Sequence, residues 1–238
     1  MGSTLRHCLK DLFGGFSVTV PRGPLAGCKW CVGAGLRQCR GTYEPRTAEA
    51  FVDSLTPGYT VFDVGAHMGY FTVATARLVG SGGRVVAFEP RPSNLRYLLR
   101  HIKVNRLANV QVVPSCVTDY VGECRFNTET GSGTGHISER GELSVSCTTI
   151  DSFVYGNGGG MPDMIKVDVE GAEYLVLEGA RRVIETSRPK LLIGLHGQNL
   201  FQKCEAWLAQ VGYTTTVVNE GRDLEILALP RDRGEDPR

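Results

Sequence analysis

The fold is decided by residues 60–70, which read TVFDVGAHMGY. The first five of these residues form a nearly all-apolar run, which is typical of a strand buried on both faces of a parallel sheet. Asp63 lies near the end of the run, and two glycines follow it, Gly65 and Gly69. Glycines in such a turn permit a tight bend and a close approach of the backbone to a ligand. A helix is predicted over residues 70–78.

The rest of the chain alternates strand and helix patterns. Strands are predicted at residues 84–89, 110–113, 164–169 and 190–195, and helices at residues 92–102, 174–184 and 200–211. This alternation predicts βαβ crossovers and a parallel sheet with helices on both faces. The last two β runs, 213–218 and 224–229, are separated by only a few residues and must pair antiparallel at one edge. We therefore predict a doubly wound, Rossmann-like α/β fold.

The pattern predicts a single catalytic domain with additions. We place the domain at residues 46–230, with a cap segment at 1–45 and a flexible, charged tail at 231–238. Within the domain, residues 116–150 alternate glycines with short β-like pieces. This stretch predicts a partly exposed antiparallel β arm.

Composition narrows the possible partners. Of 238 residues, 26 are Lys or Arg and 25 are Asp or Glu, giving a formal charge of +1. Such a neutral chain lacks the basic footprint of nucleic-acid binding, and its apolar runs fall short of the roughly 18 residues that span a bilayer. We expect a cytoplasmic protein that acts on a small molecule, without nucleic acid or membrane, and with a homodimer as an open possibility.

Eight cysteines are scattered along the chain, and we expect them to be reduced thiols. Cys28 and Cys31 form a CxxC pair, and Cys39 follows eight residues later. Zinc usually takes four ligands, so this group needs Cys8 or His7 to complete it. We expect no metal here and keep zinc as an alternative.

Two carboxylates follow neighbouring strands. Asp63 ends the first strand and Glu89 ends the second. In open α/β sheets ligands bind at the carboxyl ends of the strands, and an acidic residue there accepts hydrogen bonds from ribose hydroxyls. The turn lacks the G-x-G-x-x-G pattern of dinucleotide binders. A glycine turn of this kind with Asp63 and Glu89 at the two strand ends favours a nucleoside ligand, and S-adenosylmethionine fits best as cofactor. The alternative is a helix-capping turn beside a surface glutamate.

Charged residues mark the predicted reacting end. Lys166, Asp168 and Glu170 alternate along one strand and should share a face. His196 follows the neighbouring strand and is suited to act as a general base toward a hydroxyl. Structural alternatives are an ion pair between Lys166 and Asp168 that stabilises the strand end, and an interaction of Glu170 and Glu173 with the dipole of the following helix. Asp168 and Glu170 could instead hold Mg²⁺. His196 could bind substrate without acting as a base. We expect His101 at the surface.

Four blocks of sequence together resemble the FkbM family of S-adenosylmethionine-dependent methyltransferases. They read GTYEP at residues 41–45, VFDVGAHMGYFT at 61–72, VAFEP at 86–90 and IKVDVEGAE at 165–173. The segment TTIDS at 148–152 also matches. Two positions depart from the family pattern: His67 stands where an Asn is usual, and Gly194 stands where an acidic residue is usual.

The resemblance implies a methyltransferase fold, S-adenosylmethionine as cofactor, and methyl transfer to oxygen on a small-molecule or sugar hydroxyl. Methylation of nucleic acid or protein, and a non-catalytic cofactor-binding scaffold, remain alternatives. The catalytic residues implied are His196, Asp168, Glu170 and Lys166, and His136 could touch the acceptor. The implied cofactor-binding residues are Glu44, Thr47, Asp63, Gly65, Ala66, His67, Gly69, Tyr70, Glu89, Pro90, Asn94, Ser115, Cys116 and Asp168.

Overall fold

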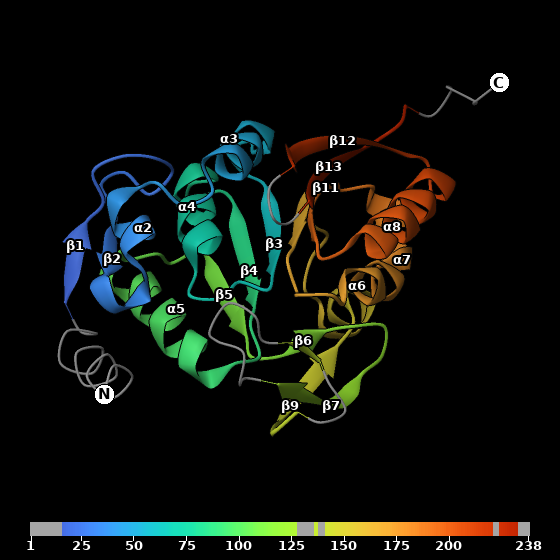
Figure 1. Ribbon diagram of the computed structural model, residues 1–238, viewed down its shortest axis with the longest axis horizontal. Coiled ribbons are helices and arrows are strands. Elements are labelled where there is room, and N and C mark those ends of the chain that lie inside the picture. Colours follow the sequence, from blue (N-terminus) through green and yellow to red (C-terminus); the bar gives the residue numbers. More distant parts are fainter. Residues whose placement is uncertain (1–15, 128–135, 138–140, 221–223, 233–238) are drawn as a thin grey trace.

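A seven-stranded sheet organises the chain in the computed structural model, which describes residues 16–127, 136–137, 141–220 and 224–232 (Figure 1). In spatial order its strands are β12 (Tyr213–Glu220), β13 (Leu224–Pro230), β11 (Lys190–Leu195), β10 (Met164–Val167), β3 (Thr60–Val64), β4 (Arg84–Phe88) and β5 (Val110–Val113). The five strands from β11 to β5 are parallel. The predicted antiparallel pair closes one edge, with β13 inserted between β11 and β12. The predicted doubly wound α/β fold is confirmed.

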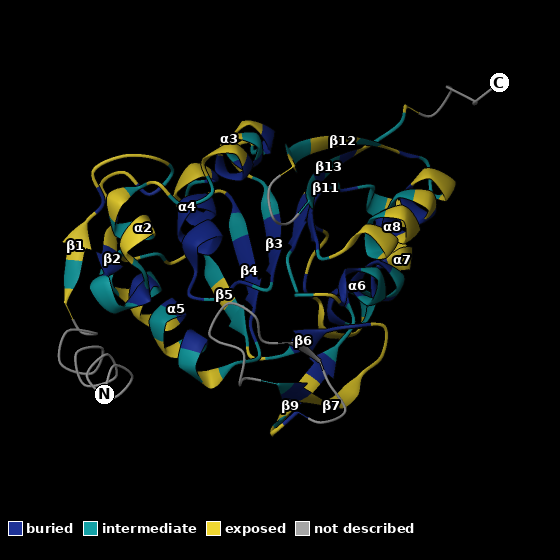
Figure 2. Cartoon of the chain, viewed as in Figure 1, coloured by how far each residue is buried: buried dark blue, intermediate teal, exposed yellow. Residues whose placement is uncertain are grey.

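Helices cover both faces of this sheet. One face packs against α3 (Pro45–Ser54), α4 (Tyr70–Leu78) and α5 (Pro92–Val104), and the other packs against α6 (Glu173–Gly179), α7 (Arg181–Ser187) and α8 (Gln198–Gln210). Figure 2 shows dark, buried central strands and helices whose outer sides are exposed. Successive strand residues face opposite layers: Val61 joins one core and Phe62 the other. The apolar runs seen in the sequence therefore serve two cores.

The single helix predicted over residues 174–184 is two helices. The chain leaves helical geometry at Ala180, between α6 and α7. At Gly179, an added Cβ would lie 2.1 Å from the carbonyl oxygen of Thr118. Asp151 accepts hydrogen bonds from the backbone amides of Arg182 and Val183 and thereby caps α7. The break comes from these tertiary contacts, which helical periodicity does not reveal.

The described part of the cap segment packs on α5 and α4. It contains β1 (Ser17–Thr19), β2 (Lys29–Cys31), the 3-10 helix η1 (Val32–Ala34) and α2 (Leu36–Arg40). His101 on α5 stacks on the Trp30 ring at 3.7 Å between centroids and accepts a hydrogen bond from the backbone amide of Cys31. The expectation of a surface His101 is wrong, because the side chain is buried between the cap and α5.

The arm is a second sheet at one side of the molecule (Figure 1). Its strands are β6 (Cys116–Val117), β9 (Leu143–Thr148), β7 (Gly122–Asn127) and β8 (His136–Ile137), in that spatial order, and the short π-helix η2 (Ser152–Gly156) follows. β7 pairs antiparallel with β8 and β9, whereas β6 pairs parallel with β9. The domain boundaries stay predictions. His7, Cys8 and most of the tail lie outside the described residues. In the described part of the chain, no helix combines the length and apolarity that crossing a bilayer needs.

Candidate active site

The turn after β3 approaches the β10 loop closely. Gly65 has φ +83°, and a Cβ there would lie 1.9 Å from the Asp168 carbonyl oxygen, so the position requires glycine. Gly69 has φ +90°, and His67 between them has φ 51°. Histidine, like asparagine, is among the residues that enter this left-handed region most readily. The turn therefore accommodates His67 in place of the Asn that the family resemblance leads us to expect.

Glu89 holds this turn together. Its carboxylate accepts hydrogen bonds from the backbone amides of His67 at 2.8 Å and Arg91 at 2.9 Å, and from the Asn94 side-chain amide at 3.2 Å. Burial raises the pKa of Glu89, and these donors oppose the rise. A carboxylate offers about four acceptor positions. Three are already used, so the carboxylate has capacity for one further donor, rather than for both ribose hydroxyls.

Asp63 lies beneath the turn. Its side chain is fully buried, and its Oδ2 accepts a 2.6 Å hydrogen bond from the Thr72 hydroxyl. Among the described residues, Oδ1 has no hydrogen-bond partner. Burial raises the pKa of Asp63, although the neighbouring Lys166 charge opposes that effect. The unpaired oxygen and the spare position on Glu89 fit a ligand that brings amino and hydroxyl donors.

A pocket connects the turn to the reacting end. Five of the predicted cofactor residues and Lys166 line it together with residues of the cap and α4. The lining consists of Trp30, Gln38, Tyr43, Gly65, Ala66, His67, Met68, Tyr70, Phe71, Lys166 and Asp168. The Tyr70 hydroxyl donates to the Tyr43 carbonyl oxygen at 3.3 Å. The cap thus covers the turn. Tyr43 belongs to the block GTYEP that carries the family resemblance, whereas Trp30 and Gln38 were not predicted individually as site residues.

The remaining predicted cofactor residues lie around this pocket. Glu44 precedes α3 with φ 40°, and the buried Thr47 donates to Glu225 of β13. Ser115 follows β5 and is half-buried, whereas the Cys116 side chain points into the core of the arm. Pro90 is half-buried and Asn94 is buried against Glu89. Their contact with cofactor stays a prediction, as does that of His136, whose side chain lies outside the described residues.

Two of the predicted catalytic residues, Asp168 and Glu170, lie in the loop after β10, and Lys166 lies on the strand itself. The Lys166 ammonium lies 3.1 Å from Asp168 Oδ2 and 4.6 Å from the centre of the Phe71 ring. Burial disfavours its charge, but the carboxylates of Asp168, Asp63 and Glu44 outweigh burial and raise the pKa of Lys166. The strand ends at Val167, so the predicted shared strand face is wrong for Glu170, which has φ 57°. The loop, rather than strand alternation, directs these side chains to one place.

His196 is surrounded by carboxylates. Its Nδ1 lies 2.8 Å from Glu173 Oε1, and its Nε2 lies 3.4 Å from Glu170 Oε2 and 3.9 Å from Asp168 Oδ1. Burial lowers the pKa of His196, but the hydrogen bond to Glu173 and the nearby negative charges raise it to about 9. All four predicted catalytic residues are therefore brought together at the carboxyl ends of β10 and β11.

Glu173 was not predicted as a site residue. It is fully buried, and its Oε1 also accepts hydrogen bonds from the backbone amides of Val169 and Gly171. This carboxylate fixes the Nδ1 side of His196 and leaves Nε2 toward Glu170 and Asp168. The sequence did point to Glu173, because this residue ends the block IKVDVEGAE. Its position at the start of a predicted helix favoured an interaction with the helix dipole instead.

Gly194 leaves room for Asp168. A Cβ at this position would lie 3.3 Å from Asp168 Oδ1. The acidic side chain that the family resemblance leads us to expect here would therefore begin next to an existing carboxylate. Its absence reduces the negative charge on this side of Asp168.

Two groups of described residues have metal-ligating spacing. Ligand atoms of Asp168, Glu170 and His196 lie within 4.8 Å of one another, as do the sulfurs of Cys116, Cys124 and Cys147. The first group could hold a divalent cation such as Mg²⁺, which prefers oxygen ligands. Within the described residues, Cys28, Cys31 and Cys39 do not form such a group.

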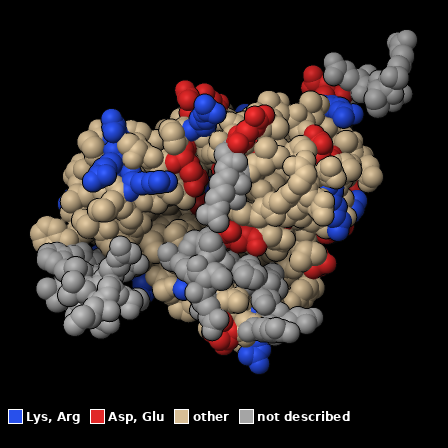
Figure 3. Space-filling view, in the orientation of Figure 1, with Lys and Arg blue, Asp and Glu red and all other residues tan. Residues whose placement is uncertain are grey.

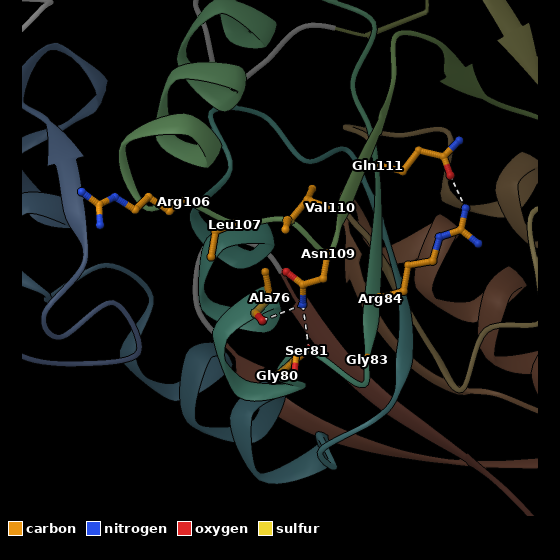
Figure 4. A pocket seen from close by; sticks show the side chains of 11 residues that line it. Ala76, Gly80, Ser81, Gly83, Arg84, Arg106, Leu107, Asn109, Val110 and Gln111 are labelled. Atoms are coloured by element: carbon orange, nitrogen blue, oxygen red, sulfur yellow. Dashed lines mark hydrogen bonds between the residues drawn. The ribbon is translucent and has the colours of Figure 1, made fainter.

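A second hollow lies at the opposite end of the sheet (Figure 4). It is lined by the starts of β4 and β5 and the end of α4, where Asn109 donates to the carbonyl oxygens of Ala76 and Gly80. Arg84 at its rim donates to the Gln111 side chain. Asn109 and Arg84 thus direct their donors to other residues of this hollow, and the predicted site residues lie at the other ends of the strands.

Comparisons with known proteins agree with this geometry. Residues 63–215 match the methyltransferase FkbM domain model. The chain is similar to the crystal structure of methyltransferase FkbM from Methylobacillus flagellatus KT, at 18% identity and TM-score 0.56, over 82% of this chain and 55% of that one. It therefore spans just over half the length of that relative. No curated protein matches this chain.

Other solved methyltransferases share the fold. Ribosomal protein L11 methylase from Lactobacillus delbrueckii subsp. bulgaricus matches at 13% identity and TM-score 0.54, over 81% of this chain and 80% of that one. Precorrin-6y C5,15-methyltransferase from Geobacter metallireducens GS-15 matches at 14% identity and TM-score 0.52, over 79% and 88%. At such identities the likeness shows the fold alone. Because the domain model matches well over half of the chain, the protein belongs to the FkbM family of methyltransferases.

Proposed function

We propose that the protein uses S-adenosylmethionine to methylate a hydroxyl oxygen of a small molecule or sugar. The observation that carries this proposal is the contact between His196 Nδ1 and the buried Glu173, which leaves the Nε2 of His196 beside Glu170 and Asp168 of the loop that follows β10. The names of the structural relatives include methylases of protein and of a tetrapyrrole. The shared fold therefore leaves the acceptor open, and the proposal depends on the side chains of this chain.

The chain's own residues divide the work. When bound, S-adenosylmethionine supplies an electrophilic methyl group on a sulfonium. The turn from Gly65 to Tyr70 and the carboxylates of Asp63 and Glu89 would hold it, with Asp168 beside the same pocket. His196 Nε2 takes the proton of the acceptor hydroxyl, while Glu173 accepts the hydrogen bond from Nδ1–H and stabilises the imidazolium. Asp168 or Glu170, both close to Nε2, orients the imidazole or accepts a hydrogen bond from a neighbouring hydroxyl of the acceptor, and Lys166 fixes Asp168.

The charge around the catalytic residues supports a neutral or cationic acceptor. Asp168, Glu170, Glu173 and Glu44 surround two cations, Lys166 and His196. An anionic acceptor would meet this excess of carboxylates at close range. Polyhydroxylated sugars, amino sugars included, are therefore preferred to phosphorylated ones.

The decisive variant is His196→Ala. We expect turnover with hydroxylated acceptors to fall about 100-fold or more, the usual contribution of a general base. S-adenosylmethionine affinity should stay unchanged, because His196 does not line the pocket. Release of the demethylated product measures turnover, and calorimetry measures affinity. Unchanged turnover would remove His196 from the mechanism.

The cofactor itself is tested in the wild-type protein. Calorimetry with S-adenosylmethionine, its demethylated product and NAD should give heat for the first two. Glu89→Gln should weaken that binding, since the variant alters the carboxylate that holds the turn. No heat with either sulfur compound, together with binding of NAD, would contradict the proposed cofactor.

A further inference from the structure

Three cysteines meet inside the β arm, away from the catalytic group. Cys116, Cys124 and Cys147 come from β6, β7 and β9, and each is at most 9% exposed. Cys116 is paired in register with Cys147 across the parallel β6–β9 ladder. Cys124 lies on β7, which pairs with the other side of β9. Three strands thus each contribute one thiol to the same buried face.

The spacing of the three sulfurs suits a single soft metal ion. Cys116 and Cys124 have sulfurs 3.9 Å apart, and all three sulfurs lie within 4.8 Å of one another. Zinc–sulfur bonds of about 2.3 Å in tetrahedral geometry separate neighbouring sulfurs by about 3.8 Å. The cysteines therefore already stand near the positions of three ligands around one ion.

The composition of this small core is unusual for apolar packing. It consists of five buried residues, the three cysteines with Phe126 and Val145, and is edged by Leu143. A single buried cysteine packs as a small apolar residue, but here three of the five buried residues are cysteines that converge from three strands. Thiolate is instead the ligand that selects zinc and copper(I) among the common metals.

A fourth ligand position is open at the edge. The Tyr120 hydroxyl lies 3.9 Å from Cys147 Sγ, and Tyr120 is 44% exposed. Either this hydroxyl or a water molecule can complete a tetrahedral set. Cysteine binds a metal as thiolate, so metal binding releases thiol protons.

We propose that Cys116, Cys124 and Cys147 form a structural site for a thiophilic metal ion, with Zn²⁺ as the ion that fits best. Binding converts three thiols and one Zn²⁺ into a trithiolate complex and releases three protons, with no change of oxidation state. Cys116 is separated from the end of β5 by only two residues. The ion would therefore hold three strands of the arm together beside the end of the sheet at which the cofactor is proposed to bind.

The wild-type protein tests the site directly. The full chain is reduced, freed of metal under argon and titrated with Cd²⁺ as probe. We expect a sulfur-to-cadmium charge-transfer band that saturates at one equivalent of Cd²⁺, with about three protons released per ion. Three cysteines should no longer react with a thiol reagent once the metal is bound. Zn²⁺ added to the metal-free protein should release the same number of protons and raise the melting temperature. No band, or an unchanged thiol count, would overturn the proposal.

Matched serine variants locate the ion. Cys124→Ser should weaken Cd²⁺ binding at least about tenfold and abolish the thermal shift with Zn²⁺. Cys39→Ser removes a half-buried thiol outside the cluster and should leave both unchanged. Equal binding by Cys124→Ser and wild type would refute the site. If Cys124→Ser fails to fold, the numbers of protons released and thiols lost by the wild-type protein still test the site. Binding by only two cysteines, or formation of a disulfide, would give different numbers.

Discussion

At the scale of single residues, the chemistry depends on the charge state of His196. Its pKa of about 9 means that only about one imidazole in a hundred is in the basic form at pH 7. The surrounding carboxylates thus make His196 a stronger base that is less often deprotonated. The same carboxylates explain why the ordinary histidine pKa, assumed from the sequence, does not apply here.

Turnover should therefore rise with pH. Between pH 7 and about 9, kcat is expected to increase about tenfold per unit and then level off, because proton removal requires neutral His196. Glu173→Gln should move the midpoint down by about one unit, since it removes the nearest negative charge. Glu178→Gln is the control, because this α6 residue pairs with Arg181 instead. A pH–rate profile with a midpoint near 6.5 in the wild type would contradict this.

The same shift affects stability with a defined sign. The folded pKa of about 9 exceeds the ordinary value of 6.5, so protonated His196 favours the folded state. This contribution is fully present below pH 6.5 and fades as the pH rises through 9. It amounts to about 3 kcal/mol at most. Urea unfolding of wild type and His196→Ala at pH 6 and pH 9 should show a smaller difference at pH 9.

At the scale of elements, the cap is attached to α5 through His101. The ring stacks on Trp30, its Nδ1 hydrogen-bonds to the Met68 carbonyl oxygen at 2.7 Å, and its Nε2 accepts the Cys31 amide at 3.0 Å. Since Nδ1 must donate and Nε2 must accept, the arrangement requires a neutral ring. Burial lowers the pKa of His101 to about 4.

Acid should consequently loosen the cap. The folded pKa lies below the ordinary 6.5, so stability is lost as the pH falls from 6.5 toward 4. His101→Phe keeps a stacking ring and removes this pH dependence. It also destabilises the protein at pH 7 by about 1–3 kcal/mol, because the Cys31 amide loses its partner. Denaturant unfolding between pH 4.5 and 7.5 measures both effects, and a variant that keeps the wild-type slope would refute the assignment.

The cap of α7 offers a second test at this scale. Asp151 accepts the amides of Arg182 and Val183 at 3.0 and 2.9 Å from a distant part of the chain. Asp151→Ala should cost about 1 kcal/mol of unfolding free energy. Asp53→Ala, an exposed acid on α3, should cost almost nothing. Equal losses in the two variants would show that α7 does not depend on this cap.

At the scale of the whole molecule, the distribution of charge argues against a polyanionic partner. The chain carries a formal charge of +1. On the face in Figure 3, acidic side chains lie across the middle, and basic ones gather mainly toward the two sides. The catalytic group adds three carboxylates around one imidazole. On this face, the described residues form no continuous basic stripe of the kind by which proteins hold phosphate backbones.

Transfer RNA should therefore neither bind nor accept methyl groups. In filter binding near physiological salt, we expect no retention at micromolar protein, whereas non-specific binders reach a Kd of about 10⁻⁴–10⁻⁶ M. Saturable retention that weakens steeply with added salt would favour the nucleic-acid alternative over the proposed small-molecule acceptor.

The architecture and the catalytic grouping could be predicted from the sequence. Buried strands read as apolar runs, and β3 and α4 were predicted with their observed bounds because local periodicity sets them. The ends of parallel strands share one edge of a sheet, so His196 and Asp168 could be placed together before their distance was known.

Only the tertiary structure decided the contacts between segments far apart in sequence. The ring of His101 is buried by a cap that lies some 70 residues earlier in the chain, α6 and α7 separate where the arm approaches Gly179, and Glu173 reaches the imidazole of His196 rather than solvent. The three arm cysteines likewise meet only through strand register. Periodicity describes which face of an element is apolar, but hydrogen bonds, pKa values and ligand sets depend on which elements face one another in space.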